Sequence, residues 1–421
     1  MTLLKKPAAE PTQSETQTGT EKVKQHALVE AKDYIFENYD IRKNTLSLEL
    51  EVVNKETGET EKADDEFFND LWYDMTIKGY KVSSDAIVKI INNKRHIIKV
   101  NPLRDYLEGL KYDGKIDYIT QLAATIKMEK RGELEVQANL WPEYLKRWLV
   151  ASVGCVLSAS VNQWCIVLNG GGGKGKSAWC NRLVPESLND YLYSGHIEPK
   201  NNVESTSNFL AEKWIINLED QLQGLQGQEY HHMKNIITVP SVTNRKAFHR
   251  TQPKRPRIAS FIASVDDPSF LVGYNNRRWL VFTVENIKYD HKVDIDNVWA
   301  QAVHLFLNGY RYWFNQEENN RLNEINKIYQ VVQMEEELLM NYFKPAQKTT
   351  EGAEHLSGSE IFNFIQDKTK RTLNTKIFHH AMEQNKFERT GDWKENINQT
   401  RYGYWVTKLN TAEPVKATET E

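Results

Sequence analysis

The sequence predicts a mixed α/β protein with a sheet-based core, a helix-rich N-terminal domain and a small C-terminal domain. Two observations support this prediction. Four short apolar runs, at residues 164–168, 214–218, 258–264 and 279–282, have the composition of buried strands. A glycine-rich stretch follows the first run directly, and segments with apolar residues at helical spacing lie on both sides of the four runs.

Length and composition fit a multidomain globular protein. The chain has 421 residues, of which 40% are hydrophobic, and a formal net charge of -3. The longest apolar run, residues 148–161, is too short to cross a membrane, so no membrane association is expected. The three cysteines form neither a CxxC pair nor a ligand cluster, which predicts a reduced, cytoplasmic protein without a zinc site.

The first part of the chain divides into a tail and a helix-rich domain. Residues 1–25 contain no aromatic side chain and are predicted to be a disordered tail. Residues 26–140 form the predicted domain, with helices at 26–35, 65–75, 84–92 and 103–110. Leu46, Leu48 and Leu50 alternate with polar residues, which favours a strand there, and residues 56–59 are typical of a turn.

The glycine-rich stretch reads GGGGKGKS and satisfies the pattern G-x-x-x-x-G-K-[ST]. In this pattern the loop amides and a helix N-terminus surround the phosphates of a nucleotide such as ATP. Lys176 is expected to reach the β- and γ-phosphates, and Ser177 to coordinate Mg²⁺. The alternative is an idle flexible loop, which its cost in backbone entropy disfavours. The candidate nucleotide-binding residues are Gly170, Gly171, Gly172, Gly173, Lys174, Gly175, Lys176 and Ser177.

Acidic residues follow two of the apolar runs. Glu219 and Asp220 end the run at 214–218, where a nucleotide hydrolase places one acid for magnesium and another for the attacking water. Ser264 or Asp266, at the end of the next run, is a candidate for sensing the γ-phosphate. The alternative is that these acids simply end strands at the surface.

Two adjacent arginines, Arg277 and Arg278, precede the fourth run. In ring ATPases an arginine at this place reaches the γ-phosphate bound by the neighbouring subunit, which accelerates hydrolysis by roughly 10³- to 10⁵-fold. The alternative is a pair of solvated surface side chains.

A strongly basic segment lies between the second and third runs. Residues 230–265 contain no Asp or Glu, whereas basic residues are frequent and Phe248 and His249 lie among them. Basic and aromatic side chains together suit a phosphate backbone and unpaired bases, and a solvated basic hairpin is the alternative. The candidate DNA-binding residues are Arg245, Lys246, Arg250, Lys254, Arg255 and Arg257.

The remaining chain is predicted to complete the core domain and to form a small separate one. The core domain spans 141–343, residues 344–355 form a linker, and residues 411–421 form a tail. Residues 356–410 have the order helix, turn, helix, strand ribbon, which is the outline of a winged helix. Its second helix would present Lys376, His379, His380 and Lys386 to DNA; a protein-packing module is the alternative.

The order of these motifs resembles the virulence-associated protein E family. The segments are GGGGKGKS, WIINLED, the basic hairpin, FIASVDD and NNRRW, and the resemblance covers roughly residues 140–343. Members of that family are phage and mobile-element ATPases related to superfamily 3 helicases and poxvirus-type primase-helicases. The resemblance implies a P-loop core of the AAA+ type with three layers, and Mg²⁺-dependent ATP hydrolysis coupled to movement on single-stranded or forked DNA. It also implies a homo-oligomeric ring, for which a hexamer is the candidate, acting with replication proteins of the host or element.

Two positions depart from the family pattern. Asn217 stands where the acidic strand usually bears an acid, and Asp266 stands where a polar sensor Asn is usual. Longer relatives carry a primase module ahead of the ATPase; with about 140 residues there and no cysteine cluster, no primase activity is expected. Two other functions stay open: an ATP-dependent DNA-binding initiator or switch without unwinding activity, and a small-molecule kinase.

Overall fold

The computed structural model describes residues 13–200, 204–243, 254–273, 275–394 and 399–409. The chain divides into two compact units. The first comprises Met1–Pro268 and Arg277–Ile325, and the second comprises Ser269–Asn276 and Asn326–Glu421. Within the described ranges, no helix combines the length and the apolar character that crossing a membrane requires.

The first unit begins with a small α/β region that has its own core. Its four-stranded sheet has the order β3-β2-β1-β4. Ile41 and Val52 on this sheet pack with Ile35, Phe68 and Ile87 from the helices. The elements are α1 (Gln13–Asn38), β1 (Tyr39–Asn44), β2 (Leu50–Asn54), β3 (Thr60–Lys62), α2 (Asp65–Ile77), α3 (Ser84–Ile91) and β4 (Ile98–Val100).

Two local predictions for this region differ from the structure. The strand predicted around Leu46 and Leu48 is wrong, because the Asn44 side chain accepts hydrogen bonds from the amides of Leu46 and Ser47 and so forms a turn. Leu48 has a φ of 62°, which no strand accommodates. Helix α1 begins at Gln13, inside the predicted tail, where Glu, Gln and Lys are good helix formers.

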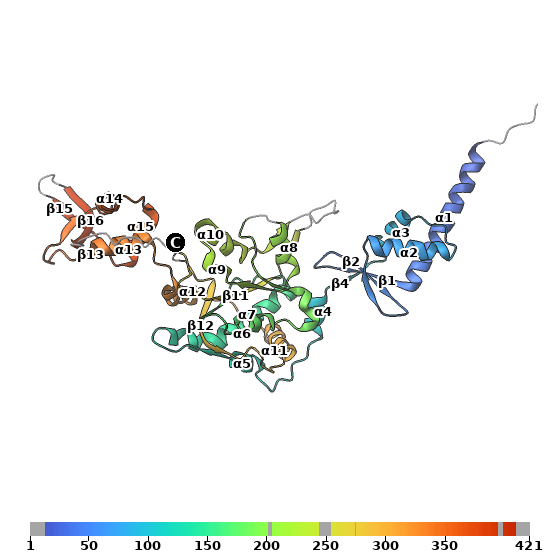
Figure 1. The fold of residues 1–421 in the computed structure, drawn as a ribbon, viewed down its shortest axis with the longest axis horizontal. Helices are drawn as coiled ribbons and strands as arrows, with labels where there is room; N and C mark the ends of the chain where they lie inside the picture. Colours follow the sequence, from blue (N-terminus) through green and yellow to red (C-terminus); the bar gives the residue numbers. More distant parts are fainter. Residues whose placement is uncertain (1–12, 201–203, 244–253, 274, 395–398, 410–421) are drawn as a thin grey trace, which may run out of the picture. The chain divides into compact units, whose positions relative to one another are not determined.

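A second set of elements forms the large core of the first unit (Figure 1). Its six-stranded sheet has the order β5-β12-β6-β11-β8-β7, in which β5 pairs antiparallel with β12 and the other neighbours are parallel. The strands are β5 (Ile126–Met128), β6 (Cys165–Asn169), β7 (Leu192–Ser194), β8 (Ile215–Glu219), β11 (Ser260–Val265) and β12 (Trp279–Ile287). All four apolar runs are therefore confirmed as strands of one sheet.

Helices cover this sheet and complete its core. Trp148 of α6 donates a hydrogen bond to Phe261 of β11, and Trp299 of α11 donates one to Leu183. The remaining elements are α4 (Pro102–Gly109), α5 (Tyr118–Ala123), α6 (Leu134–Ser158), α7 (Lys176–Asn181), η1 (Glu186–Tyr191), α8 (Glu204–Glu212), α9 (Gln221–Gly224), α10 (Gly227–Ile236), β9 (Ser241–Thr243), β10 (Lys254–Pro256), α11 (Ile295–Leu307) and α12 (Gln316–Ile325).

The core begins earlier along the chain than residue 141. Leu103, Leu107, Ile119 and Leu122 are buried in the same cluster as the central sheet, and β5 is part of that sheet. The expected division between residues 140 and 141 falls inside α6. Apolar side chains from α4 onward therefore pack with the core that follows them.

In its described residues, the second unit contains a four-stranded sheet, three α-helices and one short 3₁₀ helix. Strands β13, β16 and β14 are neighbours in that order, and β15 pairs with β16. Leu339 and Phe343 are buried with Ile361, Ile365 and Phe378, so α13 and β13 belong to this core. The elements are η2 (Asn326–Tyr329), α13 (Met334–Tyr342), β13 (Phe343–Pro345), β14 (Glu354–Leu356), α14 (Gly358–Thr369), α15 (Thr375–Gln384), β15 (Arg389–Lys394) and β16 (Gln399–Lys408).

Candidate active site

Residues 170–177, here called the glycine turn, connect the end of β6 to the beginning of α7. Gly170, Gly173 and Gly175 have φ values of 149°, 78° and 82°, a region that side chains with a Cβ rarely adopt. A Cβ at Gly175 would also overlap the ring of Tyr289. The turn therefore requires glycine at these positions.

Lys176 is buried, with 5% of its surface exposed, and its ammonium is held at the glycine turn. The Nζ atom donates to the carbonyls of Gly170 and Gly171 and lies 2.6 Å from Oδ1 of Asp266. The other lysine of the turn, Lys174, donates instead to the carbonyl of Val284 on β12, at 2.6 Å. Of the two cations, Lys176 is thus the one held against the turn's own carbonyls.

The register of the parallel strands brings the candidate acids to the same sheet edge as the glycine turn. Ser264 lies beside Leu168 of β6 on one side and beside Glu219 of β8 on the other. The Oγ atoms of Ser177 and Ser264 are 3.2 Å apart. The residues that follow these three strands therefore surround one end of the sheet.

The two candidate acids have different surroundings. Glu219 accepts a hydrogen bond of 2.6 Å from the hydroxyl of Ser194 on β7. Asp220 has a φ of 49°, and its amide donates to the carbonyl of Ser264 at 3.1 Å. Burial, followed by the nearby Asp266 carboxylate, raises the pKa of Asp220.

Arg277 and Arg278 lie at the opposite edge of the sheet. Trp279, the first residue of β12, pairs in parallel with Cys165 at the beginning of β6, whereas the glycine turn follows the end of β6. Five residues of strand separate the two edges by about 16 Å. Arg278 donates to the carbonyl of Lys234, and burial lowers its pKa.

The basic segment is described only in part. Arg245, Lys246 and Arg250 lie outside the described residues, and Lys254 is exposed at the beginning of β10. Arg255 is buried, with 5% of its surface exposed. Its guanidinium pairs with Glu212 at 2.9 Å and donates to Asn208 and to the carbonyl of Leu46. These contacts give Arg255 a structural role.

Arg257 has no exposed surface and is bound by backbone carbonyls. It donates to Ala259 at 2.9 Å, to Asn162 at 2.8 Å and to Ile237. Burial lowers the pKa of Arg257 to about 10. Because DNA cannot reach a side chain enclosed in this way, the expectation of a DNA contact at Arg257 is corrected.

The family model for the Virulence-associated protein E-like domain matches residues 107–331, which is more than half of the chain. The chain belongs to this family. The matched range includes the glycine turn, both candidate acids, the basic segment and the arginine pair. No curated protein matches the chain.

Two solved structures are among those similar to this chain. One is the apo structure of the NrS-1 C terminal region (305–718), which is 9% identical and has a TM-score of 0.48; the alignment covers 92% of this chain and 99% of that one. The other is the SCCmec type IV Cch active helicase, which is 8% identical and has a TM-score of 0.28, with 88% and 93% covered.

Both departures of this VapE-like chain from the family pattern are accounted for by contacts. Asn217 is fully buried, and its amide donates to Asn181 at 2.9 Å and to Ser194 at 3.0 Å, where a carboxylate would have no donor to offer. Asp266 is paired with Lys176, so its negative charge is compensated. The sequence did not indicate Asn181 or Ser194, because neither follows an apolar run.

Gln223 is a further residue of this edge that sequence reasoning missed. Its Oε1 atom accepts hydrogen bonds of 3.2 Å from the amides of both Asp266 and Asp267. It is located in α9, just beyond the acid pair. Gln223 therefore fixes the backbone that presents Asp266 to Lys176.

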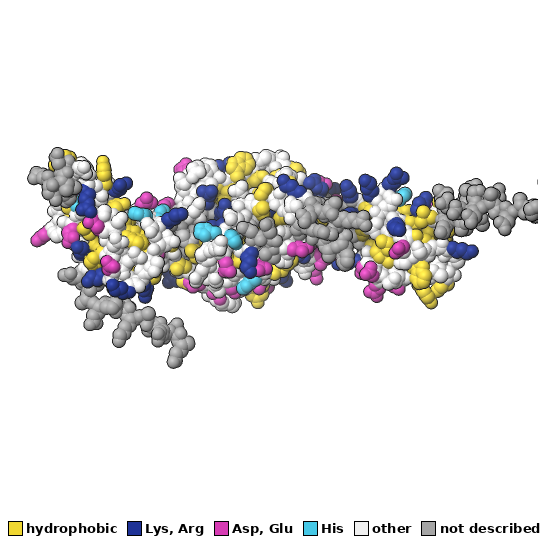
Figure 2. Space-filling model, turned by 90° about the horizontal axis from the view of Figure 1, so that it is seen from above, with side chains coloured by type: hydrophobic (Ala, Val, Ile, Leu, Met, Phe, Trp, Pro, Cys, Tyr) yellow, Lys and Arg dark blue, Asp and Glu magenta, His cyan; other side chains and the backbone are white. Residues whose placement is uncertain are grey.

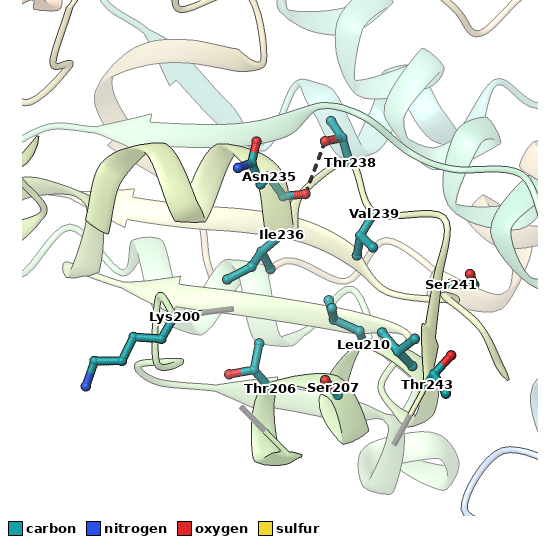
Figure 3. A pocket seen from close by; sticks show the side chains of 11 residues that line it. Lys200, Thr206, Ser207, Leu210, Asn235, Ile236, Thr238, Val239, Ser241 and Thr243 are labelled. Atoms are coloured by element: carbon teal, nitrogen blue, oxygen red, sulfur yellow. Dashed lines mark hydrogen bonds between the residues drawn. The ribbon is translucent and has the colours of Figure 1, made fainter. Parts of the chain in front are cut away.

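A cavity of about 450 Å³ lies elsewhere in the same unit (Figure 3). It is lined by Thr206, Ser207 and Leu210 of α8, by the end of α10, and by β9. None of its lining residues belongs to the glycine turn or to the acid pair. This cavity is therefore distinct from the candidate active site.

Proposed function

We propose that this chain is a Mg²⁺-dependent ATPase that acts on DNA, with a P-loop core of the AAA+ type built from three layers. The proposal extends to a ring of identical subunits that moves along single-stranded or forked DNA, as a helicase of a phage or mobile element. The observation that carries it is the meeting of Lys176, Ser177 and the acid pair at one edge of the parallel sheet.

The glycine turn suits a triphosphate. Its glycines leave the backbone amides approachable, and an ammonium is held against the turn's carbonyls. Lys176 would leave Asp266 for the β- and γ-phosphates, because a polyphosphate offers more negative charge than one carboxylate. The loop from Gly170 to Ser177, including Lys174, would line the phosphates.

The residues present also fit Mg²⁺. Ser177, Glu219 and Asp220 supply oxygen atoms, the ligands that Mg²⁺ prefers. The nearby Asp266 carboxylate also contributes, after burial, to the raised pKa of Asp220. Over the described residues, no three acidic, His or Cys side chains converge on one metal position. Mg²⁺ is commonly held by one or two carboxylates together with substrate phosphates.

The acid pair and an arginine would complete the hydrolytic site. One carboxylate of Glu219 and Asp220 would orient the attacking water, and the Ser194 hydroxyl fixes Glu219 for such a role. Arg277 or Arg278 would stabilise the charge that develops on the γ-phosphate of a neighbouring subunit. Mg²⁺, when bound, would neutralise charge on the phosphate oxygens.

DNA contact is proposed for the part of the basic segment that is not enclosed. Lys254 is exposed, and Arg245, Lys246 and Arg250 remain candidates, whereas Arg255 and Arg257 hold the fold. The second unit is proposed to be winged-helix-like. Its α14, α15 and β15–β16 hairpin have the required order, and Lys376 on α15 is exposed.

ATP hydrolysis by Lys176→Ala tests the central proposal. The variant is expected to lose ATP binding and hydrolysis by at least about 100-fold, because one charge-assisted contact to the transferring phosphate is removed. Lys213→Ala serves as the control, since Lys213 is bonded to the carbonyl of Asp190. Hydrolysis at the parental rate in Lys176→Ala would show that the site is wrong.

Two further assays separate the open alternatives. A DNA motor is expected to hydrolyse ATP faster with single-stranded DNA, whereas a small-molecule kinase should not respond to it. Strand displacement on forked DNA then distinguishes a helicase from a DNA-binding switch that hydrolyses ATP without unwinding.

A further inference from the structure

Two large aromatic side chains are exposed on the β15–β16 hairpin of the second unit. Trp393 is 57% exposed and Tyr402 is 61% exposed. The core of this unit is filled by other side chains, among them Phe343 and Phe378, which have no exposed surface. The two exposed rings therefore contribute little to the unit's own packing.

The register of the hairpin places both rings on one face. Gly391 lies opposite Tyr402, and Trp393 lies opposite Thr400. Directly opposed residues share a face of a sheet, and so do residues two apart along a strand. Arg389, two residues before Gly391, is on this face as well. We call Arg389, Trp393 and Tyr402 the aromatic face.

Gly391 lies beside the side chains of Thr400 and Tyr402 on this face. A Cβ at Gly391 would be 3.5 Å from this ring and 2.8 Å from Cγ2 of Thr400, too close for an unchanged strand. The guanidinium of Arg389 lies 5.5 Å from the centre of the Tyr402 ring, within the range of a cation–π contact. The Arg389 cation thus lies over the Tyr402 ring.

The charges of the hairpin are arranged with the acid on the other face. Asp392 is buried and pairs with Lys348 at 3.0 Å, and Arg401 pairs with Glu360 at 2.8 Å. Arg389 has no ion pair with any residue that the structure describes. Figure 2 shows basic and hydrophobic side chains close together on the part that carries this hairpin, with acidic ones interspersed.

We propose that the aromatic face binds single-stranded nucleic acid by stacking unpaired bases on Trp393 and Tyr402, with Arg389 beside the phosphate backbone. Exposed flat rings next to a cation suit unpaired bases, whose faces are free, whereas bases inside a duplex are already stacked. Among the hairpin residues that the structure describes, the side chains on this face include no carboxylate that would repel phosphate. This site shares no residue with the glycine turn, and the proposal does not depend on the proposed ATPase function.

Binding of a fluorescein-labelled oligothymidine to the full chain, followed by anisotropy at fixed salt without nucleotide, tests this proposal. Trp393→Ala and Tyr402→Ala are each expected to weaken binding by about 5- to 100-fold, the effect of losing one stacked base. Trp393→Phe keeps a ring and should retain most of the affinity. Trp313→Ala is the matched control, because Trp313 is 52% exposed in the other unit.

Three results would overturn the proposal. The first is parental affinity for oligothymidine in both alanine variants. The second is a loss of oligothymidine affinity in Trp313→Ala equal to that in the two alanine variants. The third is an equal loss of affinity in the alanine variants for a duplex of the same length, because bases in a duplex cannot stack on this face. A lower assembly mass in Trp393→Ala with unchanged DNA binding would instead make the face a contact between copies.

ATP hydrolysis measured without DNA should be parental in Trp393→Ala. Failure of the nucleic-acid proposal and failure of the ATPase proposal are therefore distinguishable.

Discussion

Asp266 and Lys176 form the ion pair at the centre of the candidate active site. The Lys176 ammonium is almost fully enclosed, whereas Asp266 is 45% exposed at its side chain. A nucleotide phosphate at the glycine turn would compete with this carboxylate for the same cation. Asp266 would therefore oppose the proposed nucleotide binding, and without a nucleotide it compensates the buried charge of Lys176.

Asp266→Asn is expected to bind ATP about three- to tenfold more tightly, because a partly exposed ion pair contributes about 1 kcal/mol. The amide would still occupy the space of the carboxylate. Isothermal titration with a non-hydrolysable ATP analogue measures the change, and Asp267→Asn is the neighbouring control. Unchanged or weaker binding in Asp266→Asn would contradict competition for Lys176.

Lys234 of α10 is a second buried cation with a consequence for stability. Burial, with a contribution from Arg278, lowers its pKa to about 7, although its Nζ lies 4.4 Å from the centre of the Tyr230 ring. The unfolded chain binds this proton up to about pH 10.4. Burying the charged lysine therefore lowers the free energy of unfolding below pH 7. This cost disappears as the pH rises from about 7 to 10.

Lys234→Met is accordingly expected to be more stable than the parent below pH 7. This advantage should shrink by about 1.4 kcal/mol per pH unit above pH 7, because only the parent has the titrating group. Thermal unfolding of both proteins at pH 6, 7, 8 and 9 gives the comparison. An advantage that does not change with pH would indicate packing rather than titration.

At the scale of elements, Arg257 links three separate segments of the first unit. Its guanidinium joins the end of α10 at Ile237, the chain before β6 at Asn162, and the chain before β11 at Ala259. Three backbone carbonyls would lose their donor without it. Removing only one partner of such a buried interaction is costly, because the other partner stays buried without its hydrogen bond.

Arg257→Ala is therefore expected to lower the free energy of unfolding by about 3 kcal/mol or more. Lys254→Ala, three residues earlier and exposed, should leave stability unchanged and weaken DNA binding with a smaller salt dependence. Chemical denaturation and a salt titration of DNA binding report on the two effects. A parental stability of Arg257→Ala would refute the structural role.

The same elements show what the sequence could and could not predict. Continuous apolar runs were sufficient for β6, β8, β11 and the beginning of β12, because strands buried on both faces need such runs. Strands β5 and β7 have three residues each and gave no comparable signal. The turn after β1 depends on the Asn44 side chain, which the alternation of leucines concealed.

For the candidate site, too, the sequence predicted some residues and missed others. Its glycine turn and acid pair follow strands directly, so their meeting at one edge follows from parallel topology alone. The basic segment failed as a guide for Arg255 and Arg257, because composition does not distinguish an exposed arginine from one that pairs with Glu212 or with backbone carbonyls. Asn181, Ser194 and Gln223 act through tertiary contacts and could not be found from spacing.

At the scale of the whole molecule, the direction of the central sheet separates the arginine pair from the glycine turn of the same chain. Arg277 and Arg278 precede β12, whereas the turn follows β6, and the two strands are parallel neighbours. About 16 Å of strand lies between these edges. An arginine that reaches the γ-phosphate is therefore expected to come from another copy of the chain, as the proposed ring requires.

Of the two arginines, Arg277 is the better candidate for this contact. Arg278 donates to the carbonyl of Lys234, whereas Arg277 makes no hydrogen bond or ion pair with the described part of the chain. Arg277→Ala is expected to bind ATP normally and to hydrolyse it at least about 10³-fold more slowly. Arg278→Ala should instead lower thermal stability, with a smaller effect on turnover.

Mixing Arg277→Ala with Lys176→Ala tests whether the contact passes between subunits. Each variant alone should be inactive, but a Lys176→Ala subunit can lend its arginine to the intact site of an Arg277→Ala neighbour. With random mixing at equal amounts, about a quarter of the parental activity should return, since half of the sites are intact and half of those have a competent neighbour. Mixing Arg277→Ala with the double variant Lys176→Ala/Arg277→Ala is the control and should stay inactive. If mass measurement shows mixed assemblies and no activity returns, the arginine does not act across a subunit interface, and the ring proposal loses its main mechanistic support.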